Sequence, residues 1–421
     1  MIVSSDPEAG APASDVDSRY AWLRLMAALA LSTIGGVGMW SVVVVLPAVQ
    51  KEFDLTRADA SLSYSLAMAG FGVGGVLLGR LVDTLGVFRP LVSCIFVLSL
   101  GYMATAFAGA HWQFAIAYGL LIAMLGSAIS FGPLMADASL WFERRRGIAV
   151  AICASGNYLA GTIWPPIVQR LVDAYGWRQT HVWIGLFCLV TMLPLALALR
   201  RPAPLIGAVS TGAPTLGLDR PTPPFSLPTL QVLLVIAGVT CCVAMSMPQV
   251  HIVAYCGDLG YGAARGAEML SLMFGFGIIS RLGSGLLADR IGGLKTLLLG
   301  SFLQTLALML YIPFDGLMSL YVISALFGLF QGGLVPSYAI VIREYYPPEQ
   351  AGTRVGITMT ATLMGMAIGG WLTGAIYDLT GSYQIAFING VLWNVVNLAI
   401  VMGLLWRGRQ TQRPPVFQPA E

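Results

Sequence analysis

The feature that most constrains this chain is a series of uninterrupted apolar segments, each about 20 residues long. A helix of that length crosses the hydrocarbon core of a bilayer, where backbone groups must bond within their own segment. Because 57% of the residues are hydrophobic and only 10% are charged, lipid must surround most of the chain. We therefore predict an all-α membrane protein with twelve transmembrane helices, at residues 25–49, 60–82, 90–109, 112–136, 147–169, 181–199, 229–254, 268–288, 294–313, 316–342, 355–377 and 384–406.

The longest interruption divides six segments from six. Residues 200–228 are rich in proline, with glycine, serine and threonine, a composition typical of a flexible linker rather than a domain. We expect five parts: an N-terminal tail (1–24), an N-terminal six-helix bundle (25–199), the linker (200–228), a C-terminal six-helix bundle (229–406) and a C-terminal tail (407–421).

The basic residues predict the orientation. With both termini in the cytoplasm, most of the 23 Lys and Arg residues lie on the inner side, and only Lys51, Arg57, Arg170, Arg178 and Arg265 lie on the outer side. This asymmetry follows the positive-inside rule and accounts for the net charge of +3 without a nucleic-acid partner. The first residues lack the features of a cleaved signal, so we expect a multi-pass protein of the cell (inner) membrane.

The sequence contains no pattern typical of an enzyme or a cofactor protein. The six cysteines lie in or beside apolar segments, without the short paired spacing of a metal site or a disulfide framework. There is no phosphate-binding loop, no metal-ligand cluster and no nucleophile with a plausible base. We predict neither catalysis nor a bound metal or cofactor.

A repeated loop supports a duplicated architecture. Residues 79–89 (GRLVDTLGVFR), after the second segment, match residues 285–295 (GLLADRIGGLK), after the eighth. Loops of this form at these two places resemble the cytoplasmic signature of the major facilitator superfamily. The resemblance implies a conformational latch that stabilises the outward-open state and includes Gly79, Asp83, Arg89, Gly285 and Asp289. The first copy departs from the usual form at Thr84 and at the Val87-Phe88 pair.

Other motifs are similar to those of the monocarboxylate transporter and oxalate:formate antiporter branch. They include residues 52–58 (EFDLTRA), 141–149 (WFERRRGIA), 176–178 (GWR) and 330–333 (FQGG), and the stretch from Trp40 to Pro47. The resemblance extends from about residue 25 to 405, without the linker. It implies alternating access by two bundles around a midplane site, in a protein that functions as a monomer.

Arg281 is the leading candidate for substrate binding. It lies within an apolar span, where a fixed charge costs roughly 3 kcal/mol unless it faces a polar cavity. Its planar guanidinium suits a carboxylate, and the resemblance implies that an arginine here pairs with the substrate anion. Gly277 and Pro47 stand where the resemblance implies proton-handling residues, which leaves proton coupling open. The resemblance also implies a second basic residue in span 11 for oxalate exchange, and its absence here favours a monocarboxylate over a dicarboxylate.

Further polar side chains in the spans are candidates for the same site. His251 can titrate near neutral pH, and Tyr255 follows one turn later on the same helical face. The other candidates are Trp40, Tyr118, Asn157 and Gln331. Each of them could instead be a hydrogen-bonding or packing partner of a neighbouring helix.

We predict a secondary active transporter of small organic anions, with monocarboxylates such as lactate or pyruvate as substrates and protons as an open second partner. One alternative is an exporter of drugs or neutral solutes with the same fold, because methionine and aromatic side chains can line an adaptable pocket. A second alternative is a membrane sensor that does not transport.

Overall fold

Long apolar helical segments make up most of the structure. The computed structural model describes residues 16–202, 223 and 225–411, and the regular structure within them is helical. Eleven helical segments of the described residues are long and apolar enough to span a membrane. One of them, Gly147–Leu197, is interrupted at Gly176, and each of its two arms is long enough to cross a bilayer. The predicted all-α membrane fold is confirmed. Most of the predicted linker, the first part of the N-terminal tail and the last part of the C-terminal tail lie outside the described residues.

The chain forms two compact units, which differ slightly from the two predicted bundles. The first unit comprises Met1–Ala213 together with Gln249–Gly275, and the second comprises Pro214–Pro248 together with Phe276–Glu421. The later part of α8 (Leu227–Asp258) and the first part of α9 (Ala263–Ile291) thus belong to the first unit.

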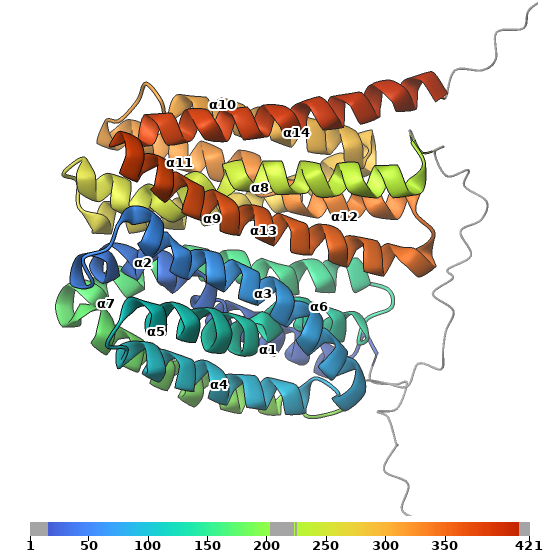
Figure 1. Cartoon of the computed structure of the whole chain (residues 1–421). Helices are drawn as coiled ribbons and strands as arrows, with labels where there is room; N and C mark the ends of the chain where they lie inside the picture. The colour runs from blue at the N-terminus through green and yellow to red at the C-terminus, as the bar shows by residue number, and fades with distance from the viewer. Residues whose placement is uncertain (1–15, 203–222, 224, 412–421) are drawn as a thin grey trace, which may run out of the picture. The chain divides into compact units, whose positions relative to one another are not determined.

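The remaining helices of the first unit run from the N-terminus to the middle of the chain (Figure 1). α1 packs against α7, α3 packs against η2, and α4 packs against both α7 and η2. Threonine caps the start of α3, where the Asp59 amide donates to the Thr56 hydroxyl at 3.1 Å. In order, these helices are α1 (Arg19–Gly35), α2 (Val37–Glu52), α3 (Arg57–Leu85), α4 (Phe88–Ala106), α5 (His111–Ile116), η2 (Ala117–Ser127), η3 (Ala128–Ser130), α6 (Gly132–Ser139) and α7 (Arg146–Leu197).

The second unit contains the last five helices and the remaining parts of α8 and α9. α10 and α14 lie side by side, and α10 also contacts α11 and α12 (Figure 1). α13 packs against α12 and α14. These helices are α10 (Gly293–Leu310), α11 (Leu317–Gln331), α12 (Leu334–Tyr345), α13 (Pro348–Thr380) and α14 (Tyr383–Thr411).

Three of the spans are discontinuous. The first span is divided at Gly36 into α1 and α2, and the span Leu317–Tyr345 is divided at Gly332 and Gly333 into α11 and α12. The span His111–Ser139 passes through the π-helical segment η2. Broken helices and π segments leave backbone groups outside the regular hydrogen-bond ladder, and such segments frequently lie at functional sites. The α11–α12 break at Gly332 and Gly333 is therefore a candidate position for a binding site.

A buried ion pair lies in the first unit. Arg24 Nε donates to Asp137 at 3.0 Å and its Nη2 donates to the other carboxylate oxygen at 2.8 Å. The two side chains are only 2% and 6% exposed. The Arg24 guanidinium also lies over the Trp141 ring, 4.4 Å from its centroid. The ion-pair partner of Asp137 is thus an arginine on α1.

Candidate substrate site and its surroundings

Arg281 lies on α9 beside the break between α11 and α12. A methyl group added to Gly332 would overlap the backbone of Gly277, one turn before Arg281. The Gly333 amide donates to the Ser280 hydroxyl at 3.1 Å, which fixes the break to the residue preceding Arg281. Only glycine permits this close approach, so the sequence at the break brings α11 directly against the arginine segment.

Gln331 is the last residue of α11 and belongs to the same junction. Its side chain is fully buried, and neither its amide nitrogen nor its amide oxygen has a hydrogen-bond partner among the described residues. A buried amide without partners carries a desolvation cost of about 1–3 kcal/mol. A polar ligand would remove this cost, so the second unit brings together two predicted residues, Arg281 and Gln331, on contacting segments.

Trp40 and Asn157 are brought together in the first unit. The Trp40 indole donates to Asn157 Oδ1 at 2.9 Å, and Asn157 in turn donates to the Met39 sulfur at 3.5 Å. The Phe274 ring packs against the Trp40 ring, and the two ring centroids are 4.0 Å apart. These contacts leave Trp40 3% exposed.

Phe274 is held on a second side by α7. Its ring makes an edge contact with Tyr158 at 5.6 Å between centroids. A methyl group added to Gly161 would lie 2.5 Å from the Phe274 ring, so glycine is needed for this approach. The sequence offered no specific sign of this aromatic cluster, which consists of Trp40, Tyr158 and Phe274.

Tyr118 lies in a separate polar cluster of the first unit. Its hydroxyl is 2.7 Å from the Ser41 hydroxyl, which is itself 2.9 Å from the Tyr102 hydroxyl. All three side chains are fully buried. Tyr118 on η2 is thus linked to Ser41 on α2 and, through Ser41, to Tyr102 on α4.

His251 and Tyr255 lie on the part of α8 that belongs to the first unit. His251 Nε2 is 3.4 Å from the Ser61 hydroxyl, and both predicted residues are 3% exposed. Seven residues after His251 along α8, Asp258 forms an ion pair with Arg57 at 2.6 Å. These contacts attach α8 to the start of α3.

The predicted latch residues lie at the ends of their helices. Asp83, Arg89 and Asp289 are exposed and form no ion pair with any described residue. A methyl group added to Gly79 or to Gly285 would meet no atom within 4 Å, so neither glycine marks a close helix contact here. The turns themselves use Gly86 and Gly292, with φ of 72° and 86°.

A second buried histidine was missed because it lies at the first residue of a predicted span. His181, on the second arm of α7, is fully buried, and its Nδ1 is 2.8 Å from the Thr105 hydroxyl. Its Nε2 has no hydrogen-bond partner among the described residues. The ring is enclosed by the aromatic rings of Tyr102, Phe114 and Trp177. Its position four residues after Trp177 was the available signal, since it places both rings on one helical face.

Comparison with known proteins identifies the family. The family model described as Major Facilitator Superfamily matches residues 28–323 and 284–421. Monocarboxylate transporter 13 of Rattus norvegicus is 27% identical over 88% of this chain and 86% of its own length. Monocarboxylate transporter 11 of Homo sapiens is 27% identical over 90% of this chain and 81% of its own length. The MFS transporter asaE of Aspergillus flavus is 26% identical over 73% of this chain and 68% of its own length.

Solved structures share the fold at low sequence identity. A nucleoside transporter, NupG, has a TM-score of 0.72 at 13% identity and covers 92% of this chain and 100% of its own. A bacterial homolog of the human lysosomal transporter Spinster, in an inward-facing and occupied conformation, has a TM-score of 0.68 at 13% identity, covering 93% of this chain and 96% of its own. The chain therefore belongs to the Major Facilitator Superfamily and is a multi-pass membrane transporter.

Proposed function

We propose that this protein is a secondary transporter of small organic anions, and that it binds a monocarboxylate such as lactate or pyruvate at Arg281 and Gln331. The observation that carries the proposal is the contact between the Arg281 segment of α9 and the α11 break, beside a buried glutamine amide without described partners. The likeness to monocarboxylate transporters 11 and 13 supports the same substrate class.

The two side chains suit a carboxylate. A guanidinium presents parallel N–H groups that match the two oxygens of one carboxylate, and it keeps its charge at any physiological pH. The Gln331 amide supplies both a donor and an acceptor, so it can also bond the keto or hydroxyl group of a 2-oxo or 2-hydroxy acid. Arg281 provides one positive charge, which favours substrates with one negative charge.

The transport cycle is proposed to follow alternating access by two six-helix bundles, residues 25–199 and 229–406, in a monomer. The protein would lie in the cell membrane, with both termini in the cytoplasm. Asp83, Arg89 and Asp289 would act as latches, biasing the two states without touching substrate. Proton coupling would proceed through the acid itself, since desolvation in a closed cavity favours the protonated form of a carboxylic acid.

Export of drugs or neutral solutes is the second candidate function. It is favoured by the likeness to the agnestins efflux protein AgnL12 of Paecilomyces divaricatus, which is 25% identical over 67% of this chain and 64% of its own length, and by the aromatic cluster of Trp40, Tyr158 and Phe274, which offers stacking surfaces. In that case Arg281 would be a structural residue, and its loss would change neutral-solute transport through stability alone.

Uptake of radiolabelled lactate, pyruvate and neutral solutes into proteoliposomes tests the proposal. Two charge-assisted hydrogen bonds are worth about 1.5–3 kcal/mol each, so Arg281→Gln should lower anion uptake by about 100-fold or more. Arg281→Lys should restore little of it, because an ammonium lacks the planar fork. Gln331→Leu should raise KM for the acid.

A matched control is Arg343→Gln, which removes an exposed arginine from the last turn of α12, outside both latch loops. We expect it to leave uptake within about twofold of wild type, since an exposed charge contributes little. Normal lactate uptake by Arg281→Gln would refute the anion site. Uptake of neutral solutes alone would favour the exporter, and binding without uptake of any solute would favour a sensor.

A further inference from the structure

A cavity lies at the ends of four spans in the second unit, and Arg281 is not among its lining residues. It has a volume of about 420 Å³, within the range of about 300–1,000 Å³ typical of ligand pockets. Its lining includes Ile291, Gly293, Tyr345 and Gly408, each of which is the terminal residue of a candidate membrane span. The cavity is therefore at the boundary between the apolar spans and water.

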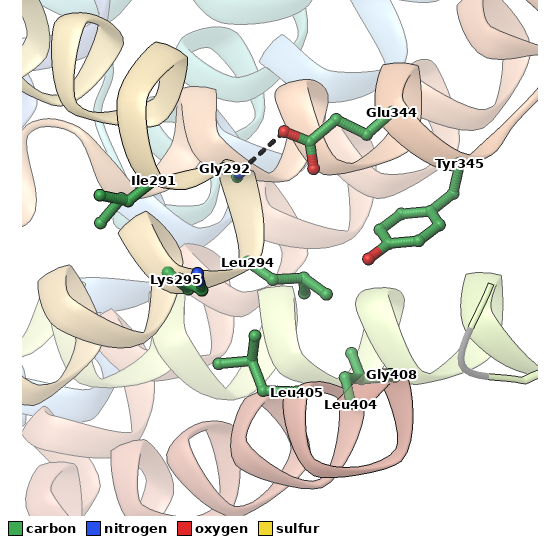
Figure 2. A pocket seen from close by; sticks show the side chains of 10 residues that line it. Ile291, Gly292, Leu294, Lys295, Glu344, Tyr345, Leu404, Leu405 and Gly408 are labelled. Atoms are coloured by element: carbon green, nitrogen blue, oxygen red, sulfur yellow. Dashed lines mark hydrogen bonds between the residues drawn. The ribbon is translucent and has the colours of Figure 1, made fainter. Parts of the chain in front are cut away.

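The walls of this cavity are largely apolar, and polar side chains also line it. Leu294, Leu404 and Leu405 contribute the walls, and Lys295 and Tyr345 contribute an ammonium and a hydroxyl (Figure 2). Figure 2 shows the Tyr345 hydroxyl directed toward the space between Leu294 and Leu404. Neither Lys295 nor the Tyr345 hydroxyl has a hydrogen-bond or ion-pair partner in the part of the chain that the structure describes.

The remaining charged group of the lining already has a partner. Glu344 Oε1 accepts the Gly293 amide at 2.7 Å and so caps the start of α10 (Figure 2). The positive end of the α10 dipole stabilises this carboxylate, and the helix end is therefore not free to bind an external anion. Lys295, in the first turn of α10, experiences the same positive end as a repulsion. An anion beside Lys295 would relieve that repulsion.

We infer that this cavity binds the phosphate group of an anionic phospholipid, with Lys295 and Tyr345 on the phosphate and the leucine walls along the glycerol and the first acyl carbons. A soluble anion would use only Lys295 and Tyr345, whereas a lipid would also use the apolar walls. With the proposed orientation the cavity faces the cytoplasmic leaflet, where anionic lipids attract basic residues. The site is separate from the proposed substrate site and does not depend on which solute is carried.

Native mass spectrometry tests this inference by measuring lipid binding to the full-length protein in detergent. The probes are phosphatidylglycerol and phosphatidylcholine with the same acyl chains. Wild type should retain phosphatidylglycerol preferentially. One lysine near an anionic surface is worth about 1 kcal/mol, so Lys295→Gln should weaken phosphatidylglycerol binding about fivefold and leave phosphatidylcholine unchanged. Tyr345→Phe, which keeps the ring, should weaken it by a smaller factor.

Arg343→Gln is the matched control, because Arg343 is an exposed basic residue one position before Glu344 that does not line the cavity. It should bind both lipids as wild type does. Equal loss in Arg343→Gln and Lys295→Gln would reduce the effect to general surface charge and overturn the inference. Unchanged lipid binding in Lys295→Gln would overturn it as well. Complete displacement of the lipid by millimolar inorganic phosphate would overturn the role of the apolar walls.

Discussion

The buried pair of Arg24 and Asp137 makes the sharpest stability prediction. Both side chains are almost completely removed from solvent, at 2% and 6% exposed, and they are joined by two hydrogen bonds of 3.0 and 2.8 Å. Replacing Asp137 by Asn would keep the shape of the side chain but leave the Arg24 charge buried without its counter-charge. Breaking such a pair by removing one partner costs about 3–5 kcal/mol.

This magnitude is measurable and depends on the charge rather than on the volume lost. A loss of 3–5 kcal/mol corresponds to a decrease of roughly 10 °C in the unfolding midpoint of a unit of this size. Removing both charges in Arg24→Met/Asp137→Leu should recover most of the loss, because an apolar pair of similar volume avoids the desolvation cost. The recovery should be incomplete, since Arg24 also donates to the Arg201 carbonyl at 3.0 Å.

The assay is thermal unfolding of the purified protein in detergent, monitored by the fraction that remains monodisperse. The control is Glu268→Gln, which breaks an exposed ion pair with Arg265 at 3.0 Å, with side chains 40% and 52% exposed. Exposed pairs contribute about 0–1 kcal/mol, so this variant should unfold close to wild type. Equal effects of Asp137→Asn and Glu268→Gln, or a double variant as unstable as Asp137→Asn, would refute the reasoning.

Three further predictions concern the transport cycle. Gly161→Leu should place side-chain atoms against the Phe274 ring and slow transport. Adding Phe274→Ala to this variant should restore part of the transport rate. A wild-type rate of uptake by Gly161→Leu would contradict the tight contact between Gly161 and Phe274. Asp83→Asn should slow uptake while leaving equilibrium substrate binding unchanged, and loss of binding would rule out a latch role. His251→Gln should keep acid-stimulated uptake, measured with and without an inward proton gradient, whereas loss of the gradient response would assign the proton to His251.

The helical type of the membrane spans and their approximate number could be predicted from hydrophobic length alone, because a chain of this composition must satisfy its backbone hydrogen bonds within each span. The breaks could not. Gly36 and the pair Gly332-Gly333 lie in continuous apolar segments, and only the packing of neighbouring helices shows that the chain departs from one straight helix there. The π-helical segment from Ala117 to Ser127 has no distinguishing residue in the sequence.

The candidate site was predicted only in part, for a similar reason. Arg281 was evident because a lone charge in an apolar span is costly, and Gln331 because it is a polar side chain within an apolar span. The partnership of Trp40 with Asn157 joins residues 117 positions apart, and no spacing rule relates them. The Arg24–Asp137 pair was missed because each residue, taken alone, fits the inner end of its own span. Such pairs become visible only when helices distant in sequence are placed together.

Gly176 has a consequence for how this protein is made. Each arm of α7 exceeds the about 20 residues needed to cross a bilayer, and the two arms meet at one residue with φ of 76°. If both arms cross, they must run in opposite directions with almost no loop between them. They would then leave the translocon as one helical hairpin, and an epitope tag inserted at Gly176 would be tolerated less well than one in the longer connection around Gly109.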